Sequence, residues 1–84
     1  MNINPNFKKI LEAKGIDIST GVLQSSGKIR FGSVYREGDW SYSVSKNIAY
    51  QSTASFIAED EKVCVDREWT LENDKLILLR EDMI

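Results

Sequence analysis

The sequence predicts an α+β domain: one N-terminal helix packed on a curved antiparallel β-meander of five to six strands, closing into a half-barrel or a small barrel. Two observations lead to this class. Apolar residues recur at helical spacing only near the N-terminus, over about residues 5–14, and from residue 18 to residue 80 the spacing changes to two. Each later connection has the length of a hairpin turn. We therefore expect one domain over residues 1–84, with the helix at about 5–14 and the meander at about 18–80.

Residues at both ends of the first segment favour a helix. Asn4 is a good N-cap, and Pro5 suits the first helical position, where its missing N–H costs nothing. Gly15 supplies a left-handed residue that ends the helix. The residues expected to face the sheet are Ile3, Phe7, Ile10, Leu11 and Lys14. A helix this short is marginal alone, so it should be docked on the sheet.

Strict alternation in the run from Lys28 to Phe56 predicts the middle of the sheet. Trp40, Tyr42 and Val44 should face the interior, with serines 41, 43 and 45 on the other side. The inward residues of the neighbouring strands should be Ile29, Phe31 and Tyr35 on one side and Ile48, Tyr50 and Phe56 on the other. A bend or bulge is expected near Ser52 and Ala54, which are poor core residues.

The five turns predict which residues face each other across the strands. The expected pairs are Leu23 with Ile29, Tyr35 with Trp40, Phe31 with Val44, Val44 with Ile48, Tyr42 with Tyr50, Phe56 with Val63, Leu71 with Leu76, and Trp69 with Leu78. Asn47 should take a left-handed conformation in its turn, and Asn73 and Asp74 should form a two-residue turn. The last strand, Lys75 to Leu79, is apolar on both faces. Either the helix or another subunit should cover its second face, and a homo-oligomer through this strand is one prediction.

Composition bounds the partners and the compartment. The 84 residues carry a net charge of −2 with a pI near 5.0, which gives no field that would concentrate nucleic acid or an anionic membrane. Cys64 is the only cysteine, so no internal disulfide is expected and a reducing compartment is favoured. No secretory leader precedes the helix, and no apolar run approaches the ~18 residues of a membrane span. We expect a soluble cytoplasmic protein.

Catalytic, metal and cofactor sites are not predicted. The chain has no histidine, and Cys64 lies between two valines with no basic partner to activate it. Asp66 and Glu68 share a strand face at a spacing that an acid–base pair would suit, but a solvated strand face is the favoured explanation. The acidic turn 59–61 lacks the spacing of a calcium loop. The expected function is therefore not enzymatic.

The candidate binding residues are Lys28, Arg30, Arg36, Tyr42, Tyr50 and Trp69. The three basic residues should lie on the outward face of one strand, beside the serine face of the next. The favoured function is binding to another protein, as an inhibitor, immunity or accessory protein does.

Two alternatives stay open. An OB-like or barrel surface could bind single-stranded nucleic acid, although the alternation should send the rings away from the basic residues. A small ligand could instead occupy a cavity lined by Tyr35, Trp40, Tyr50 and Trp69.

Two segments, Thr20 to Tyr35 and Phe56 to Glu81, resemble the C-terminal OB-type domain of NfeD membrane proteins. The shared features are a strand, a Ser-Gly turn, a basic-apolar strand and a final hairpin. This chain has a longer intervening stretch and lacks the expected glycine before Val63. The resemblance covers about half of the chain and carries over no functional residue.

Overall fold

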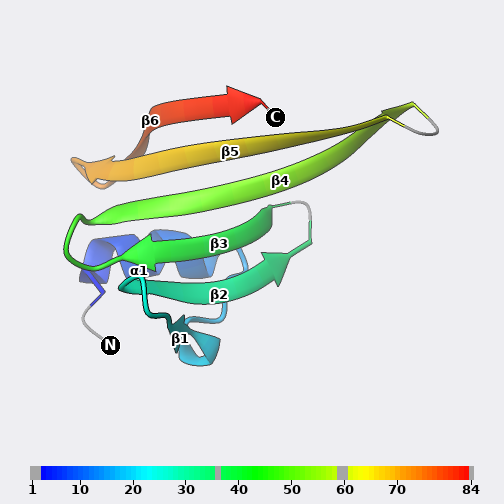
Figure 1. Ribbon diagram of the computed structural model, residues 1–84. Helices are drawn as coiled ribbons and strands as arrows, with labels where there is room; N and C mark the ends of the chain where they lie inside the picture. Colours follow the sequence, from blue (N-terminus) through cyan, green and yellow to red (C-terminus); the bar gives the residue numbers. More distant parts are fainter. Residues whose placement is uncertain (1–2, 36, 59–60, 84) are drawn as a thin grey trace.

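The computed structural model describes the backbone of residues 3–35, 37–58 and 61–83, and their side chains except 55–58 and 61–62. An α-helix, α1, is followed by a 3₁₀ helix, η1, and by six strands in the spatial order β1-β2-β3-β4-β5-β6 (Figure 1). Their bounds are α1 Pro5–Ala13, η1 Ile18–Thr20, β1 Val22–Leu23, β2 Lys28–Val34, β3 Gly38–Ser43, β4 Ile48–Ala58, β5 Glu61–Glu72 and β6 Lys75–Met83. The helix-plus-meander class is confirmed, but the sheet is open and no barrel closes.

Helix α1 begins at the predicted residue, Pro5, and ends at Ala13, one residue before the predicted end. The Asn4 side chain accepts a hydrogen bond of 3.0 Å from the Asn6 N–H, and Pro5 follows at the first position. Gly15 has a φ of 91° just beyond the helix. The 3₁₀ helix η1 was not predicted. It begins after Asp17, whose carboxylate accepts hydrogen bonds from the N–H and the hydroxyl of Ser19.

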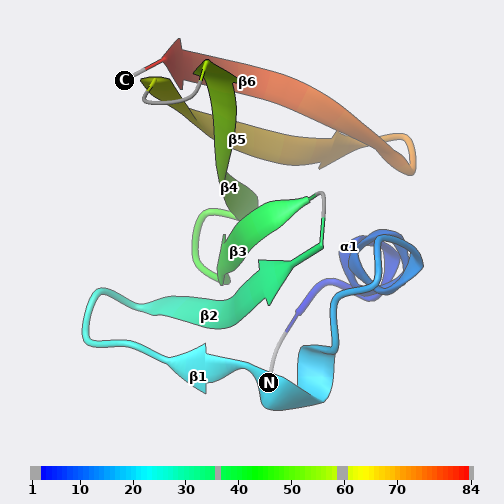
Figure 2. The same cartoon turned by 90° about the vertical axis from the view of Figure 1, so that its right-hand side faces the viewer.

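The core lies between α1 and one face of the sheet, the inner face. Figure 2 shows the helix end-on at one side of the strands. Trp40 and Tyr42 are each 1% exposed, and the Phe7 ring packs edge-on against Tyr42 with 4.9 Å between ring centroids. The other buried residues of this core are Ile3, Leu11, Ile16, Ile18, Ile29 and Ala49. The predicted inward direction of Trp40 and Tyr42 is therefore confirmed, whereas Val44 lies in a turn and is exposed.

The predicted register between β3 and β4 is wrong by one residue. Tyr42 pairs with Ala49 and Ser41 with Tyr50, so Ile48 and Tyr50 lie on the face opposite α1. The cause is a four-residue connection, 44–47, in which the Asn47 N–H donates to the Ser43 carbonyl at 2.8 Å. Asn47 has the predicted left-handed conformation, with a φ of 54°. Small Ala49, completely buried, takes the inward place expected of a larger residue.

The predicted register between β2 and β3 is also wrong. Trp40 pairs with Gly32 and Gly38 with Val34, and Tyr35 is 84% exposed instead of inward. Two glycines cause this shift. Gly32, with a φ of 88°, follows a bulge between Arg30 and Gly32, and Gly38, with a φ of 85°, follows a tight turn closed by a hydrogen bond from the Glu37 N–H to the Val34 carbonyl.

The remaining hairpins give a mixed result. Leu23 pairs with Ile29, Leu71 with Leu76 and Trp69 with Leu78, as predicted. Asn73 and Asp74 form the two-residue turn with positive φ. Phe56 pairs with Lys62 instead of Val63. The irregularity in β4 lies between Phe56 and Ala58 and not near Ser52 and Ala54, because pairing with β5 is continuous from Ile48 to Phe56.

Strand β6 forms one edge of the open sheet. Apolar residues of this strand stay partly exposed, with Leu79 at 53% and Ile77 and Leu78 lower. A bulge at Leu79 interrupts its pairing with β5, and Lys75 and Arg80 flank the apolar run. Bulges and charges on an edge strand oppose pairing with another strand. Self-association through this strand therefore stays a prediction.

Candidate functional site

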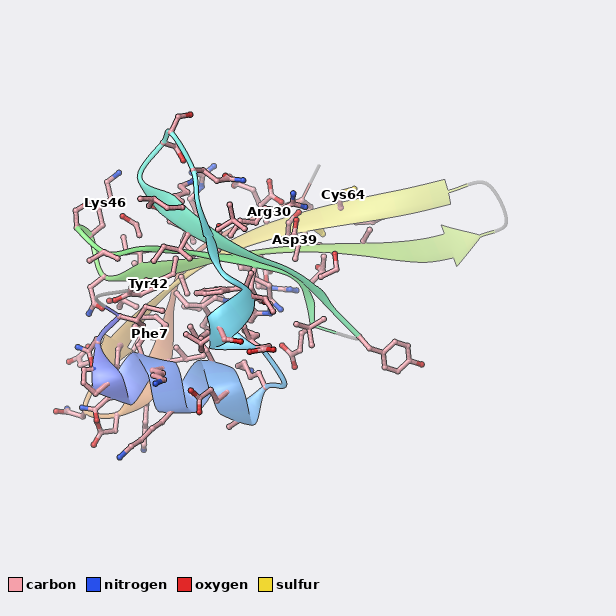
Figure 3. The ribbon with its side chains drawn as sticks, turned by 90° about the horizontal axis from the view of Figure 1, so that it is seen from below. Phe7, Arg30, Asp39, Tyr42, Lys46 and Cys64 are labelled. Atoms are coloured by element: carbon pink, nitrogen blue, oxygen red, sulfur yellow. The ribbon has the colours of Figure 1, made fainter. Side chains whose placement is uncertain are left out.

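The face of the sheet opposite α1, the outer face, is uncovered and polar. No helix among the described residues lies on it, and Figure 3 shows Arg30, Asp39 and Lys46 on that side while Phe7 and Tyr42 lie on the other. Alternation places these side chains on the outer face: Lys28, Arg30, Asp39, Ser41, Tyr50, Ser52, Asp66, Glu68, Arg80 and Asp82. This face thus carries most of the charges of the sheet.

A shallow groove crosses the strands on this face. Its lining includes Lys28 from β2, Ser41 from β3, Tyr50 and Ser52 from β4, Asp66 and Glu68 from β5, and Arg80 from β6, with Lys46 from the β3–β4 turn. A second depression, lined by Arg30 and Asp39, adjoins it and shares Lys28 and Ser41. The groove exists because short serines lie between long charged and aromatic side chains.

Three arginine–carboxylate contacts organise the outer face. Arg30 donates to Asp39 at 3.0 Å, and Arg80 donates to Glu68 at 3.4 Å and also to Asp82. Asp82 is the main cause that raises the pKa of the Arg80 guanidinium. The two guanidinium groups are exposed, so the pairs add little stability, but they neutralise Arg30 and Arg80.

Two lysines of the groove are not neutralised in this way. The Lys28 ammonium lies over the Tyr50 ring, 3.8 Å from its centroid. Lys46 is exposed at the tip of the β3–β4 turn. Among the described residues, neither lysine lies within ion-pair distance of a carboxylate. Both face the same groove, so positive charge is concentrated at its β2–β4 end.

The structure separates the predicted binding residues into two groups. Lys28, Arg30 and Tyr50 lie together on the outer face, whereas Tyr42 and Trp69 face α1. Arg36 lies outside the described residues. The expectation that the rings point away from the basic residues is wrong for Tyr50, because the β3–β4 register is shifted. Lys46 was not singled out from the sequence; its position in the turn after the serine face was the available signal.

Polar groups on the inner face serve the fold. The Gln51 side chain accepts from Trp69 Nε1 at 3.0 Å and donates to the Glu37 carbonyl at 2.6 Å. The Glu37 carboxylate is 3.6 Å from Lys14, which lies near the Trp40 ring. These contacts hold the C-terminal end of α1 over β3 and β4. They also give buried Gln51 its partners, as a buried amide requires.

Tyr42 is fixed beneath α1. Its hydroxyl donates to the Asn47 side chain, which ties the core to the left-handed residue of the β3–β4 turn. Burial raises the pKa of Tyr42 above its usual value, against an opposite effect of a hydrogen bond with the Asn4 backbone. A side chain buried in this way acts in folding, and its ring is not presented to a partner.

The cavity proposed for a small ligand is not formed by its four residues. Trp40 and Trp69 face α1, Tyr50 lies on the outer face, and Tyr35 projects from the end of β2. A shallow space does lie between α1 and η1, lined by Ile3, Pro5, Lys8, Glu12, Asp17, Ile18 and Ser19. It contains none of the predicted site residues.

The side chains considered for catalysis, Asp66, Glu68 and Cys64, lie on the outer face, where the two carboxylates already have hydrogen-bond partners. Asp66 and Glu68 share the outer face and border the groove, where Ser52 donates to Asp66 at 2.8 Å and Arg80 to Glu68. Cys64 pairs with Ala54 on the same face. The described residues contain no group of acidic or cysteine side chains arranged to hold a metal ion. Residues 59 and 60 and the Glu61 side chain lie outside the described part.

Replacing Asp66 with asparagine is expected to stabilise the protein by about 0.2–1 kcal/mol, because Asp66 and Asp82 are paired directly across β5 and β6 and like charges at such positions repel. Asparagine keeps the oxygen that accepts from Ser52. Urea unfolding of Asp66→Asn and of Ser52→Ala separates the two effects. A loss of stability in Asp66→Asn would show that the carboxylate contributes more than it repels.

No helix among the described residues is long and apolar enough to cross a membrane. The chain matches no family model, and no curated protein or solved structure is significantly similar to it. Any functional conclusion therefore rests on the residues of the outer face.

Proposed function

We propose that this protein is a non-catalytic binding protein and that its outer face is the surface that contacts another protein. One observation carries this proposal: the helix covers only one face of the sheet, while the other presents a groove and an adjoining depression that together contain a tyrosine, two lysines, Arg30 and Arg80. Tyrosine and arginine are enriched where protein interfaces form their strongest contacts. An inhibitor, immunity or accessory protein acts through such a surface.

Several features support a protein partner over the alternatives. The groove contains charged side chains of both signs, and such a mixture suits a polar protein interface. Nucleic acid would meet the carboxylates of Asp39, Asp66, Glu68 and Asp82 on the same face. Single-stranded nucleic acid also needs several free aromatic surfaces, whereas Tyr50 on this face lies against Lys28.

Site-specific photocrosslinking tests the proposal in the cell that makes the protein. A photoreactive phenylalanine derivative is placed at Ser52, exposed on the outer face, and in a matched variant at Lys9, exposed on α1. We expect a discrete protein adduct from position 52 and none of the same mass from position 9. Adducts formed only from position 9, or from neither position, would contradict the outer face as the interface.

A further inference from the structure

We propose that the groove on the outer face takes an extended acidic peptide segment, whose carboxylates pair with Lys28 and Lys46. This inference rests on the proposed function and names the chemistry of the partner. It follows from the distribution of neutralised and free charge across the five strands that form the groove.

The first step is the charge that the fold leaves unpaired. Arg30 is held by Asp39, and Arg80 by Glu68 and Asp82. Within the described part of the chain, the ammonium groups of Lys28 and Lys46 have no carboxylate of their own. They border one groove, so an acidic segment that enters it can pair with both cations without breaking an existing ion pair.

The second step is the way in which Lys28 is held. Its ammonium lies 3.8 Å from the centre of the Tyr50 ring, which restrains the long side chain over β4. An ammonium group has three N–H donors, and stacking on a ring leaves donors free for a carboxylate. Less side-chain freedom is then lost when a ligand binds. Lys28 also borders both depressions, so it lies where a ligand crossing from β2 to β4 must pass.

The third step is the size of the occupant. The groove runs from β2 to β6, and four strand spacings of about 4.8 Å make about 19 Å, which six extended residues at about 3.3 Å each would span. The N–H groups inside the sheet are used in strand pairing, so a lone small anion finds only side-chain donors here. A chain that also contacts Tyr50, Ser41 and Ser52 gains more contacts than such an anion.

The fourth step concerns direction. Asp66 lies toward the β5–β6 end of the groove and has a serine partner but no arginine or lysine in the described residues. This carboxylate repels acidic residues of the ligand at that end and favours an N–H or hydroxyl donor there. The acidic residues of the segment should therefore lie over β2–β4.

Fluorescence anisotropy with a labelled hexaglutamate peptide tests the inference on the whole protein. We expect saturable binding at low salt that weakens as salt is added. Lys28→Gln and Lys46→Gln should each raise Kd about twofold to fivefold, the size of one or two exposed ion pairs. Asp66→Asn should lower Kd, because hexaglutamate spans the groove and also places glutamates over its β5–β6 end. Hexalysine, of opposite charge, and a dT6 oligonucleotide, as a nucleic acid, are the ligands compared with hexaglutamate.

Lys9→Gln is the matched control, because it removes the same charge from the exposed side of α1. An equal loss of affinity in Lys9→Gln would show that net charge alone attracts the peptide, and it would overturn the groove as the binding site. Absence of hexaglutamate binding at low salt, or tighter lysine-dependent binding of dT6, would also overturn it. Crosslinking from position 52 is independent of these results, so the proposed function can stand while the acidic ligand fails.

Discussion

Phe7→Ala is expected to lower the free energy of unfolding by about 3–5 kcal/mol, the usual cost of removing a large aromatic side chain from a core. Phe7 is completely buried and packs edge-on against Tyr42, so its ring joins α1 to β3. A chain of 84 residues has a total stability of about 4–13 kcal/mol, by the range of 0.05–0.15 kcal/mol per residue. The substitution therefore removes a large part of the stability.

Urea unfolding followed by tryptophan fluorescence measures this effect, because Trp40 is buried under the same helix and Trp69 packs at its border. Lys9→Ala is the control: it lies two residues away on the exposed side of α1 and should change stability by no more than about 0.5 kcal/mol. A loss below about 1 kcal/mol in Phe7→Ala would mean that the helix is held mainly by other contacts. If Phe7→Ala is already unfolded without urea, its loss of stability equals or exceeds the whole stability of the parent protein.

The sequence shows which side chains of the central strands point into the core. It does not show which residues of neighbouring strands pair with each other. Trp40 and Tyr42 point inward because an alternating strand with rings on one side has only one way to bury them. The position of Tyr50 depended on the length of the next turn, and one additional residue in that turn put it on the opposite face. Alternation within a strand is local, whereas register depends on left-handed residues and bulges that composition does not reveal.

The same limit applies to the candidate site. Lys28 and Arg30 were placed correctly on the outer face, since they alternate with Ile29 inside one strand. Their meeting with Tyr50 and Lys46 depends on the registers of two hairpins and on the turn between β3 and β4. A groove formed by short serines between longer side chains is a property of several strands together. No single segment of the sequence contains it.

Gly38→Ala is expected to destabilise the protein by about 2–5 kcal/mol, the sum of a conformational cost and a steric cost. Gly38 has a φ of 85°, a conformation that costs other residues about 1–2 kcal/mol. A Cβ at this position would also clash with the Ser52 carbonyl oxygen and lie 2.8 Å from a Thr53 methyl carbon. Overpacking of this kind adds about 1–3 kcal/mol. The backbone oxygen belongs to β4 and cannot move without disturbing its pairing with β3.

Gly27→Ala separates the two contributions, because Gly27 has nearly the same φ, 89°, and open space where its Cβ would be. Gly27→Ala should lose only the stability that the left-handed conformation costs. The difference in unfolding free energy between the two variants then measures the steric cost of the close approach of β3 to β4. Equal losses in the two variants would show that no close approach exists. The contact also bears on the groove, since Asp39 follows Gly38 and pairs with Ser52 on the outer face. A Gly38→Ala protein that still folds should therefore show altered amide shifts at Asp39 and Ser52, and Gly27→Ala should not.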